Sequence, residues 1–281
     1  MGYSRIKSFA KINLALNITG KSFALHKIES IISFLDIHDL ILIKKRNNKN
    51  HKIKFSGVFS KDIRKKNTIS KLLSILDKKK LLNNAKFEIL IKKNVPTEAG
   101  LGGGSMNAAN ILKFLIKNGV INISKKEIIE ISSLIGSDVI LGMYSKNLVL
   151  KSDNKIKKFS NIKKIYTLIV KPNFGCSTKK IYSEVKNFKK PIFNNPNKKM
   201  FNLQFLQRMS NDLELVAFRK YPKLHILKTF LQKLSDVKFA RMTGSGSAVI
   251  AYFSSNKLCK DAKKKVSKQF RNYWCKTAKT I

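Results

Sequence analysis

The chain has 281 residues, of which 43% are hydrophobic, and it carries a formal net charge of +42. Such a hydrophobic content is typical of a folded protein, and the length is large for a single core, so two domains are expected. No apolar run approaches the roughly 18 residues that a membrane span requires, and the first residues lack the apolar core of a signal peptide. We therefore expect a cytoplasmic protein with no membrane association.

The positive charge has two possible explanations. A strongly basic protein attracts nucleic acid or another acidic partner. Only seven of the 58 basic residues are Arg, however, and Arg is the residue that recognises bases and phosphates through paired hydrogen bonds. The lysines are spread along the whole chain, as a biased amino-acid usage at exposed positions would produce. Specific nucleic-acid binding is therefore not expected, although anionic ligands are still attracted.

The cysteines and histidines give no sign of a metal site. Cys176, Cys259 and Cys275 are odd in number and widely separated, which favours a reducing compartment and thiols that serve as packing residues. The four histidines are equally dispersed.

Strands dominate the first part of the predicted α+β fold. Residues 10–18 alternate between apolar and polar and are followed by Gly20, which predicts a half-buried strand. Similar runs predict strands over 40–43, 53–55 and 87–91. Asn67 and Thr68 can cap a helix with one apolar face, formed by Ile69, Leu72, Leu73 and Leu76.

The segment PTEAGLGGGSMNAA, residues 96–109, places four glycines directly before a helix-forming run. Glycine lets backbone amides approach a ligand closely, and the first turn of a helix offers unpaired N–H groups to an anion. The segment is not a Walker loop, because no lysine lies between Lys93 and Lys113, and Ser105 stands where a dinucleotide-binding turn needs glycine. It is either a phosphate site built from backbone amides or a plain strand-to-helix connection, in which Ser105 would be only a helix cap.

A second helix and an acidic residue follow this loop. Ser124 and Glu127 form a capping box that opens a helix, and Gly136 ends it. Asp138 comes directly afterwards, where an acid most often caps the next helix or is solvated.

The second half of the chain continues the α+β pattern. Residues 145–163 are polar and rich in lysine, so we predict a boundary there, with domains over 1–155 and 156–281. A strand is predicted over 165–170 and helices over 177–186, 200–219 and 223–235. A second glycine turn, RMTGSGSAVIAYF, runs into a strand and fits either a tight turn or a lid over a ligand.

Three segments together resemble a known family. FAKINLALNITGK, PTEAGLGGGSMNAANIL and RMTGSGSAVIAYF are similar, in order and spacing, to the three motifs of the GHMP kinases. The resemblance covers essentially the whole chain and implies a two-domain GHMP kinase fold with the active site in the cleft between the domains. Within the superfamily, Lys11-Ile12-Asn13, the GLGGGS loop and Gly136 to Val139 are most similar to the branch that phosphorylates the 2-hydroxyl of 4-diphosphocytidyl-2-C-methyl-D-erythritol.

The resemblance implies a role for each part of these motifs. Asp138 would accept the proton of the attacking hydroxyl, and Lys11 would act as its partner or stabilise charge on the alkoxide or the γ-phosphoryl group. Ser105 could also hold the Mg²⁺ ion that accompanies ATP. The implied ATP-binding residues are Pro96, Thr97, Glu98, Ala99, Gly100, Leu101, Gly102, Gly103, Gly104, Ser105 and Met106.

The acceptor site departs from the family pattern at one position. His26 would hydrogen-bond the cytosine and Tyr182 would stack on it, but Leu25 stands where the family has a second stacking tyrosine, a loss that Phe23 could offset. Asn13 shares a strand face with Lys11 and suits a polar group of the substrate. The alternatives are a homoserine or mevalonate type of kinase, or a non-catalytic basic protein that binds nucleic acid. We expect a monomer or a weak homodimer.

Overall fold

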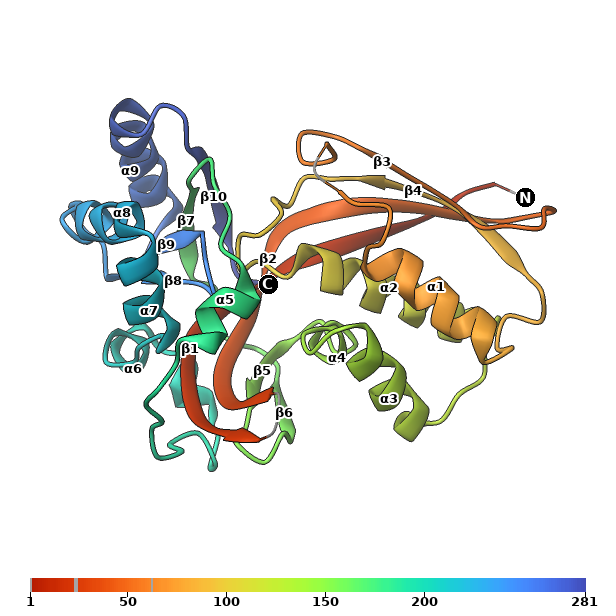
Figure 1. The fold of residues 1–281 in the computed structure, drawn as a ribbon. Helices are drawn as coiled ribbons and strands as arrows, with labels where there is room; N and C mark the ends of the chain where they lie inside the picture. The colour runs from red at the N-terminus through yellow and green to blue at the C-terminus, as the bar shows by residue number, and fades with distance from the viewer. Residues whose placement is uncertain (1, 23–24, 62) are drawn as a thin grey trace. The chain divides into compact units, whose positions relative to one another are not determined.

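The computed structural model describes residues 2–22, 25–61 and 63–281, and it divides into two compact units. Unit 1 consists of Met1–Lys11, Ile37–Thr97 and Gly102–Ser145. Unit 2 consists of Ile12–Asp36, Glu98–Leu101 and Lys146–Ile281. Each unit is therefore assembled from three separate stretches of the chain (Figure 1).

Two long strands open the chain and contribute residues to both units. Strand β1 covers Ser4–Ser22 and pairs with β2, which covers Leu25–Arg46. The strand predicted over 10–18 is thus confirmed, but the prediction that it is half buried is wrong. Residues 12–18 are buried on both faces, with Leu16 and Ile18 in the apolar core of unit 2 and Asn13 hydrogen-bonded within the same unit.

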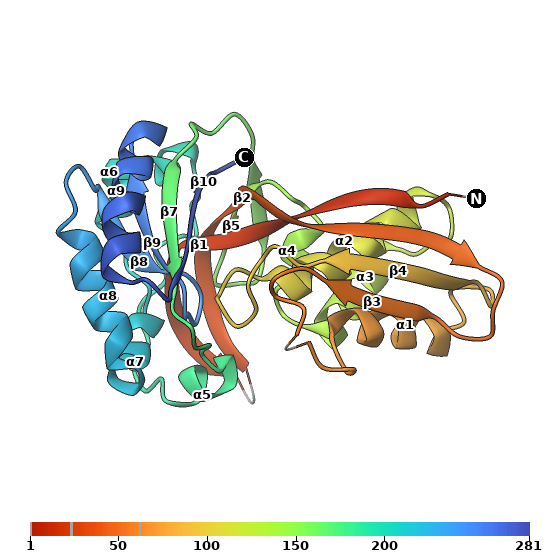
Figure 2. The same ribbon diagram turned by 90° about the horizontal axis from the view of Figure 1, so that it is seen from above.

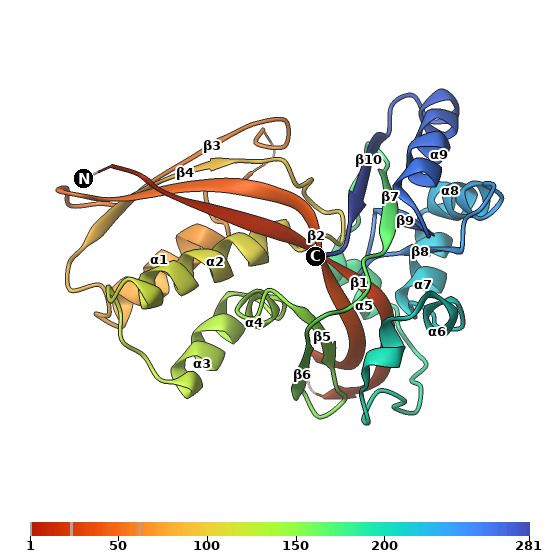
Figure 3. The same cartoon turned by 180° about the vertical axis from the view of Figure 1, so that it is seen from behind.

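Unit 1 is a sheet covered by helices on one face (Figure 3). Strands β3 (Lys52–Ser56) and β4 (Lys86–Lys92) are parallel, and β4 runs antiparallel to the later part of β2. Helix α1 (Thr68–Lys78) connects the parallel pair, and α2 (Gly103–Lys117), α3 (Lys125–Ile135) and the short α4 (Val139–Gly142) follow. Aliphatic side chains of these strands and helices form one core, as the predicted apolar face of α1 requires.

The helix ends in unit 1 follow the predicted capping signals. The Asn67 side chain accepts hydrogen bonds from the backbone N–H groups of Ile69 and Ser70 at the start of α1. Ser124 and Glu127 form the predicted capping box of α3. Helix α2 differs, because its N-cap is Gly102 and no side chain caps it.

Unit 2 contains a hairpin and a four-stranded antiparallel sheet. The hairpin of β5 (Asn147–Leu150) and β6 (Ile156–Phe159) joins the early part of β2. The second sheet has the order β10-β7-β9-β8, and helices α7 to α9 cover one of its faces (Figure 2). Its strands are β7 (Tyr166–Lys171), β8 (Phe239–Met242), β9 (Val249–Phe253) and β10 (Trp274–Lys279).

The helices of unit 2 are mostly short. They are α5 (Thr178–Ser183), the 3-10 helix η1 (Lys198–Phe201), α6 (Leu203–Gln207), α7 (Leu213–Lys220), α8 (Pro222–Gln232) and α9 (Asn256–Gln269). The single helix predicted over 200–219 is therefore wrong, since the chain leaves the helical path between α6 and α7. There the Asn211 side chain hydrogen-bonds to backbone groups outside the helix, Met242 O and Gly244 O.

The last residues of the chain pair with an early strand. The backbone N–H of Ile281 donates to Phe34 O at 3.0 Å, that of Lys279 donates to Asp36 Oδ1 at 2.9 Å, and Leu35 forms a bridge with Thr280. Both of these distant stretches therefore contribute to unit 2. Over the described part of the chain, none of the helices has the length and apolar content needed to cross a membrane.

Candidate active site

The glycine segment enters helix α2 through a left-handed residue. Gly102 has φ of +65°, a conformation that strains residues with a Cβ, and it immediately precedes the first residue of α2. A Cβ at this position would lie 2.7 Å from Cγ and 3.0 Å from Cε of Lys11. Two features therefore require glycine at position 102: the left-handed backbone and the Lys11 side chain that lies against it.

The geometry of the first turn of α2 favours an anion site over a plain strand-to-helix connection. Within the described part of the chain no side chain caps the helix, so its first N–H groups keep their capacity to bind a ligand. Ser105 is not the N-cap, since it is the third residue of the helix and lies close to Gly136, whose Cβ, if present, would lie 4.0 Å from Ser105 Oγ. The Thr68 hydroxyl donates to Gly104 O at 2.8 Å and ties this turn to α1.

Lys11 and Asp138 form an ion pair within unit 1. Lys11 Nζ lies 3.0 Å from Asp138 Oδ2, and the lysine side chain is 4% exposed whereas the aspartate side chain is 32% exposed. Asp138 is the N-cap residue of α4, but its carboxylate makes no capping hydrogen bond. The carboxylate is thus held by the lysine while one third of its side chain remains accessible to a ligand.

The earlier residues of the glycine segment pack within unit 2. Glu98 O accepts a hydrogen bond from Ser247 N at 3.1 Å, and Ala99 O accepts one from Ala248 N. Gly100 has φ of +71°, and a Cβ there would collide with Thr243 O. Of the predicted ATP-binding residues, Pro96, Ala99, Leu101 and Met106 are buried, so their side chains support the backbone of the segment.

The late glycine turn is a tight connection between antiparallel strands β8 and β9. Thr243 Oγ1 accepts from Asn13 N at 3.0 Å and donates to Gly100 O at 3.2 Å. These contacts support the interpretation as a structural turn. Asn13 is 3% exposed, and its side-chain amide also donates to Ser30 Oγ at 2.8 Å.

His26 and Tyr182 come together in unit 2, as the acceptor-site prediction requires. Their ring centroids are 5.3 Å apart with the planes inclined at 47°. A third ring, Phe188, lies 6.2 Å from His26 and is 45% exposed. Sequence reasoning missed Phe188, whose only signal was a single aromatic residue shortly after Tyr182. Phe23 lies outside the described residues, and so does the side chain of Leu25.

The imidazole of His26 has unused hydrogen-bonding capacity. Its Nε2 atom is buried and has no hydrogen-bond partner among the described residues. Burial lowers the pKa of His26 below its usual 6.5, and the positive charge of Lys21 lowers it further. The ring is therefore neutral near pH 7 and can donate or accept a hydrogen bond.

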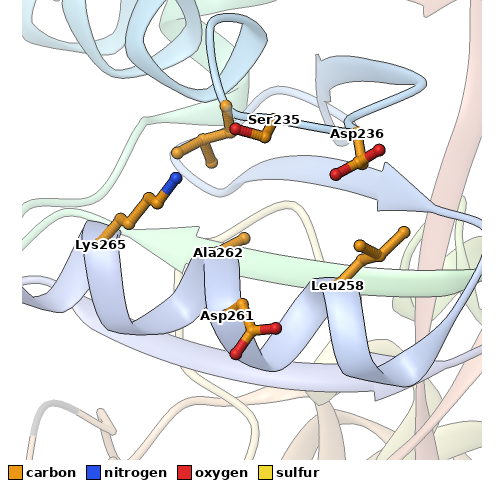
Figure 4. Close-up of a pocket in the computed structure, with 7 residues that line it drawn as sticks. Ser235, Asp236, Leu258, Asp261, Ala262 and Lys265 are labelled. Atoms are coloured by element: carbon orange, nitrogen blue, oxygen red, sulfur yellow. The ribbon is translucent and has the colours of Figure 1, made fainter.

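A separate pocket in unit 2 contains none of the predicted site residues. It has a volume of about 210 Å³ and lies between helix α9 and residues 234–236 (Figure 4). Within the described ranges, no group of three or more His, Cys, Asp or Glu side chains is arranged to hold a metal ion.

Comparison with known proteins agrees with the fold. The GHMP kinases N terminal domain matches residues 67–146, and the GHMP kinases C terminal domain matches residues 185–272. A crystal structure of 4-(cytidine 5'-diphospho)-2C-methyl-D-erythritol kinase superposes with a TM-score of 0.76 at 20% identity, covering 98% of this chain and 99% of the other. Homoserine kinase from Cytophaga hutchinsonii superposes with a TM-score of 0.72 at 15% identity, covering 99% and 94%.

The fold and the two family matches define a GHMP kinase, an enzyme class that uses ATP. The 4-diphosphocytidyl-2-C-methyl-D-erythritol kinase of Pelagibacter ubique is 55% identical over 281 residues, covering 100% of both chains. That of Clostridium tetani is 30% identical over 287 residues, covering 99% of this chain and 100% of its own. The chain therefore belongs to the 4-diphosphocytidyl-2-C-methyl-D-erythritol kinase family.

Proposed function

We propose that this kinase transfers the γ-phosphoryl group of ATP to the 2-hydroxyl of 4-diphosphocytidyl-2-C-methyl-D-erythritol, a step in non-mevalonate isoprenoid precursor synthesis. The full-length identity to relatives of that name supports the substrate. The observation that carries the chemistry is the Lys11–Asp138 ion pair, because the same lysine lies against Gly102 at the start of the phosphate-binding helix.

In the proposed reaction the oxygen of the acceptor hydroxyl attacks the γ-phosphorus, and the bond to the oxygen that bridges the β- and γ-phosphates breaks. The proton of the hydroxyl passes to the exposed carboxylate of Asp138, and ADP leaves. Phosphoryl transfer has a loose transition state, so the protein mainly positions the reactants and neutralises charge. Lys11 orients the carboxylate of Asp138. The ammonium group of Lys11 also lies where negative charge develops on the alkoxide or the γ-phosphoryl group.

The segment from Pro96 to Met106 is proposed to hold the triphosphate, chiefly through backbone amides at the start of α2. Mg²⁺ bound there would neutralise the β- and γ-phosphates. The donor set fits this ion, because Mg²⁺ commonly rests on substrate phosphates and water with one or two protein oxygens. Ser105 is the proposed protein ligand, since its hydroxyl lies in the first turn of α2.

For the acceptor, we propose that His26 hydrogen-bonds the cytosine through the unpartnered Nε2 atom and that Tyr182 stacks on the ring. Phe188 supplies further aromatic surface beside His26. Asn13 is proposed to contact a polar group of the acceptor, although its internal hydrogen bonds restrict it to a fixed orientation.

The remaining features of the organisation are also proposals. We propose an N-terminal domain over 1–155 and a C-terminal domain over 156–281, supported by family matches that end at 146 and resume at 185. A cytoplasmic location is supported by the three free cysteines. A monomer or weak homodimer is supported by the net charge of +42, which makes copies of the chain repel one another.

A coupled assay tests the reaction. The purified protein is supplied with ATP, Mg²⁺ and the cytidyl acceptor, and ADP is measured, with homoserine and mevalonate as alternative acceptors. We expect ADP only with the cytidyl acceptor. Turnover of homoserine or mevalonate alone would move the enzyme to another branch of the superfamily. Absence of turnover together with salt-sensitive RNA binding, unchanged by Asp138→Asn, would support the non-catalytic alternative.

A further inference from the structure

A buried carboxylate in unit 1 connects both flanks of the glycine segment. Asp39, on β2, is 0% exposed. It accepts hydrogen bonds from the backbone N–H groups of Asn94 and Val95 at 2.8 Å each, immediately before the segment begins. It also accepts one at 2.9 Å from Asn107 Nδ2, on α2 just after the segment ends.

The fourth partner of Asp39 is a buried lysine. Antiparallel pairing of β2 with β4 places Leu40 opposite Lys92, so Asp39 and Lys93 are adjacent, and Lys93 Nζ forms an ion pair with Asp39 Oδ2. Lys93 is 2% exposed. A Cβ on Gly103 would lie 3.2 Å from Lys93 Nζ and 3.1 Å from Val95 Cγ1, so the pair lies directly beneath the first residue of α2.

Such a pair is an inefficient source of stability. Removing two charges from water carries a large desolvation cost, and apolar replacements of similar volume are often as stable or more so. Its four hydrogen bonds have fixed directions, however, and they join residues that precede and follow the anion-binding turn. The Asn107 amide reaches Asp39 through Nδ2, and its Oδ1 atom is buried and makes no hydrogen bond within the described residues.

We infer that Asp39 and Lys93 are positioning residues for the nucleotide, acting through Asn107 and the 94–95 backbone to fix the start of α2 relative to the strand that precedes it. This inference rests on the proposed function, in which the amides of that turn hold the phosphates. With the turn held in place, the amides need no rearrangement when ATP binds, which lowers the cost of binding.

The neutral variant Asn107→Ala provides the first test, because it removes the α2 arm without leaving a buried charge unpaired. We expect the Kd for ADP, measured by calorimetry, to rise about tenfold, as loss of a hydrogen bond to a charged group suggests. The KM for ATP should rise in parallel, and the KM for the cytidyl acceptor should not change. Asn110→Ala is the matched control, since Asn110 lies one turn further along α2 and donates to Met106 O and Ser8 Oγ instead.

The double variant Asp39→Asn/Lys93→Met is the second test, because it removes both charges together. The amide at position 39 can still accept from the 94–95 backbone, but its NH₂ group cannot accept from Asn107 Nδ2. Any bond that it donates to Asn107 Oδ1 lacks the charge of the carboxylate, so the charge-assisted link to α2 is lost. We therefore expect a melting temperature near that of the wild type with a Kd for ADP that remains raised about tenfold.

The results separate this inference from the proposed function. Wild-type affinity for ADP in a folded Asn107→Ala protein, or recovery of affinity together with stability in the double variant, would show that the pair is only structural. Should the double variant fail to fold, Asn107→Ala alone decides. If the wild type itself neither binds ADP nor turns over substrate, the proposed function fails and the positioning role fails with it.

Discussion

At the scale of single residues, Lys11 and Asp138 differ in how far their side chains are exposed, and this difference suits them to different roles. The lysine side chain is almost completely buried, so its position is fixed by the surrounding packing. The carboxylate remains partly exposed and makes no capping bond, so it can meet a hydroxyl group from outside. A residue that served only to cap α4 would show the opposite arrangement, with its oxygen bonded to the backbone of the next turn.

Asp138→Asn should therefore reduce kcat by about 10²- to 10⁴-fold, the range typical of a general base. The melting temperature should change little, because the carboxylate supports no helix end and the amide oxygen of the variant can still accept from Lys11. The Kd for ADP should also change little. The matched control is Asp77→Asn, since Asp77 is similarly exposed, at 33%, and pairs with Lys86 at 2.7 Å. A kcat for Asp138→Asn within threefold of the control would contradict the assignment.

His26 leads to a prediction about pH. Because its pKa lies below the usual 6.5, the ring is mainly neutral at pH 6.5 and above, and it becomes mainly charged only in more acidic solution. We expect the KM for the cytidyl acceptor to change little between pH 8 and 7 and to rise as the pH falls below 6.5, as protonation removes the acceptor on the ring.

The comparison variant for this pH profile is His26→Gln, which should have a raised KM that no longer depends on pH in this range. His225→Gln serves as the control, because His225 stacks on Phe218 and is not one of the proposed site residues. A rise below pH 6.5 that persists in His26→Gln would assign the effect to another group.

At the scale of elements, local sequence signals predicted where helices begin better than they predicted whether a segment forms a strand. Capping side chains act over three or four residues, so the starts of α1 and α3 could be read from Asn67 and from Ser124 with Glu127. The β5–β6 hairpin inside the polar segment 145–163 was missed, because strand β5 is buried by pairing with distant β2. Such pairing is a tertiary effect that a local composition does not record.

The candidate site likewise contains residues that the sequence could predict and residues that only tertiary contacts reveal. Residue types and spacing pointed to the glycine segment, whereas Lys11 and Asp138 were assigned only through the resemblance to the GHMP kinase motifs. Asp39 and Asn107 were missed, since single polar residues in apolar surroundings acquire meaning only when strand pairing brings them together. His26 and Tyr182 were found through the resemblance, whereas Phe188 belongs to a segment with no regular structure to predict.

The start of α2 supports a prediction with an internal control. Gly102→Ala should cost about 1 kcal/mol for the left-handed backbone and should also displace Lys11, so kcat should fall on the order of 100-fold. Gly119→Ala has the same backbone cost, because Gly119 has φ of +66°, but nothing lies within 4 Å of its Cβ position. We expect a lower melting temperature for Gly102→Ala than for Gly119→Ala, because only the former also displaces the buried Lys11, and we expect loss of kcat in Gly102→Ala alone. Equal activity in the two would mean that the Lys11 contact is not required.

At the scale of the whole molecule, the net charge of +42 is the dominant physical property. Both proposed substrates are anions, so a positive field raises their local concentration around the protein. The field extends about 8 Å at physiological ionic strength and shortens as salt is added.

We therefore expect the KM values for ATP and for the cytidyl acceptor to rise several-fold between about 0.05 M and 0.5 M NaCl, while kcat changes little. Steady-state kinetics at constant pH and free Mg²⁺ would measure this, with KCl at equal ionic strength to exclude an effect specific to sodium. KM values that are flat across the series would show that the lysines contribute nothing to substrate capture.

The interleaved composition of the two units has a consequence for how the protein is made on the ribosome. Every residue of unit 1 precedes Lys146, so this unit can fold while the rest of the chain is still being translated. Unit 2 needs Ile12–Asp36 together with residues near Thr280, which emerge last. The early half of β2 must therefore wait with an exposed edge throughout elongation, a period in which such edges invite misassembly. Neither unit corresponds to one continuous gene fragment, so separate expression of the halves would require segment 12–36 to be supplied in trans.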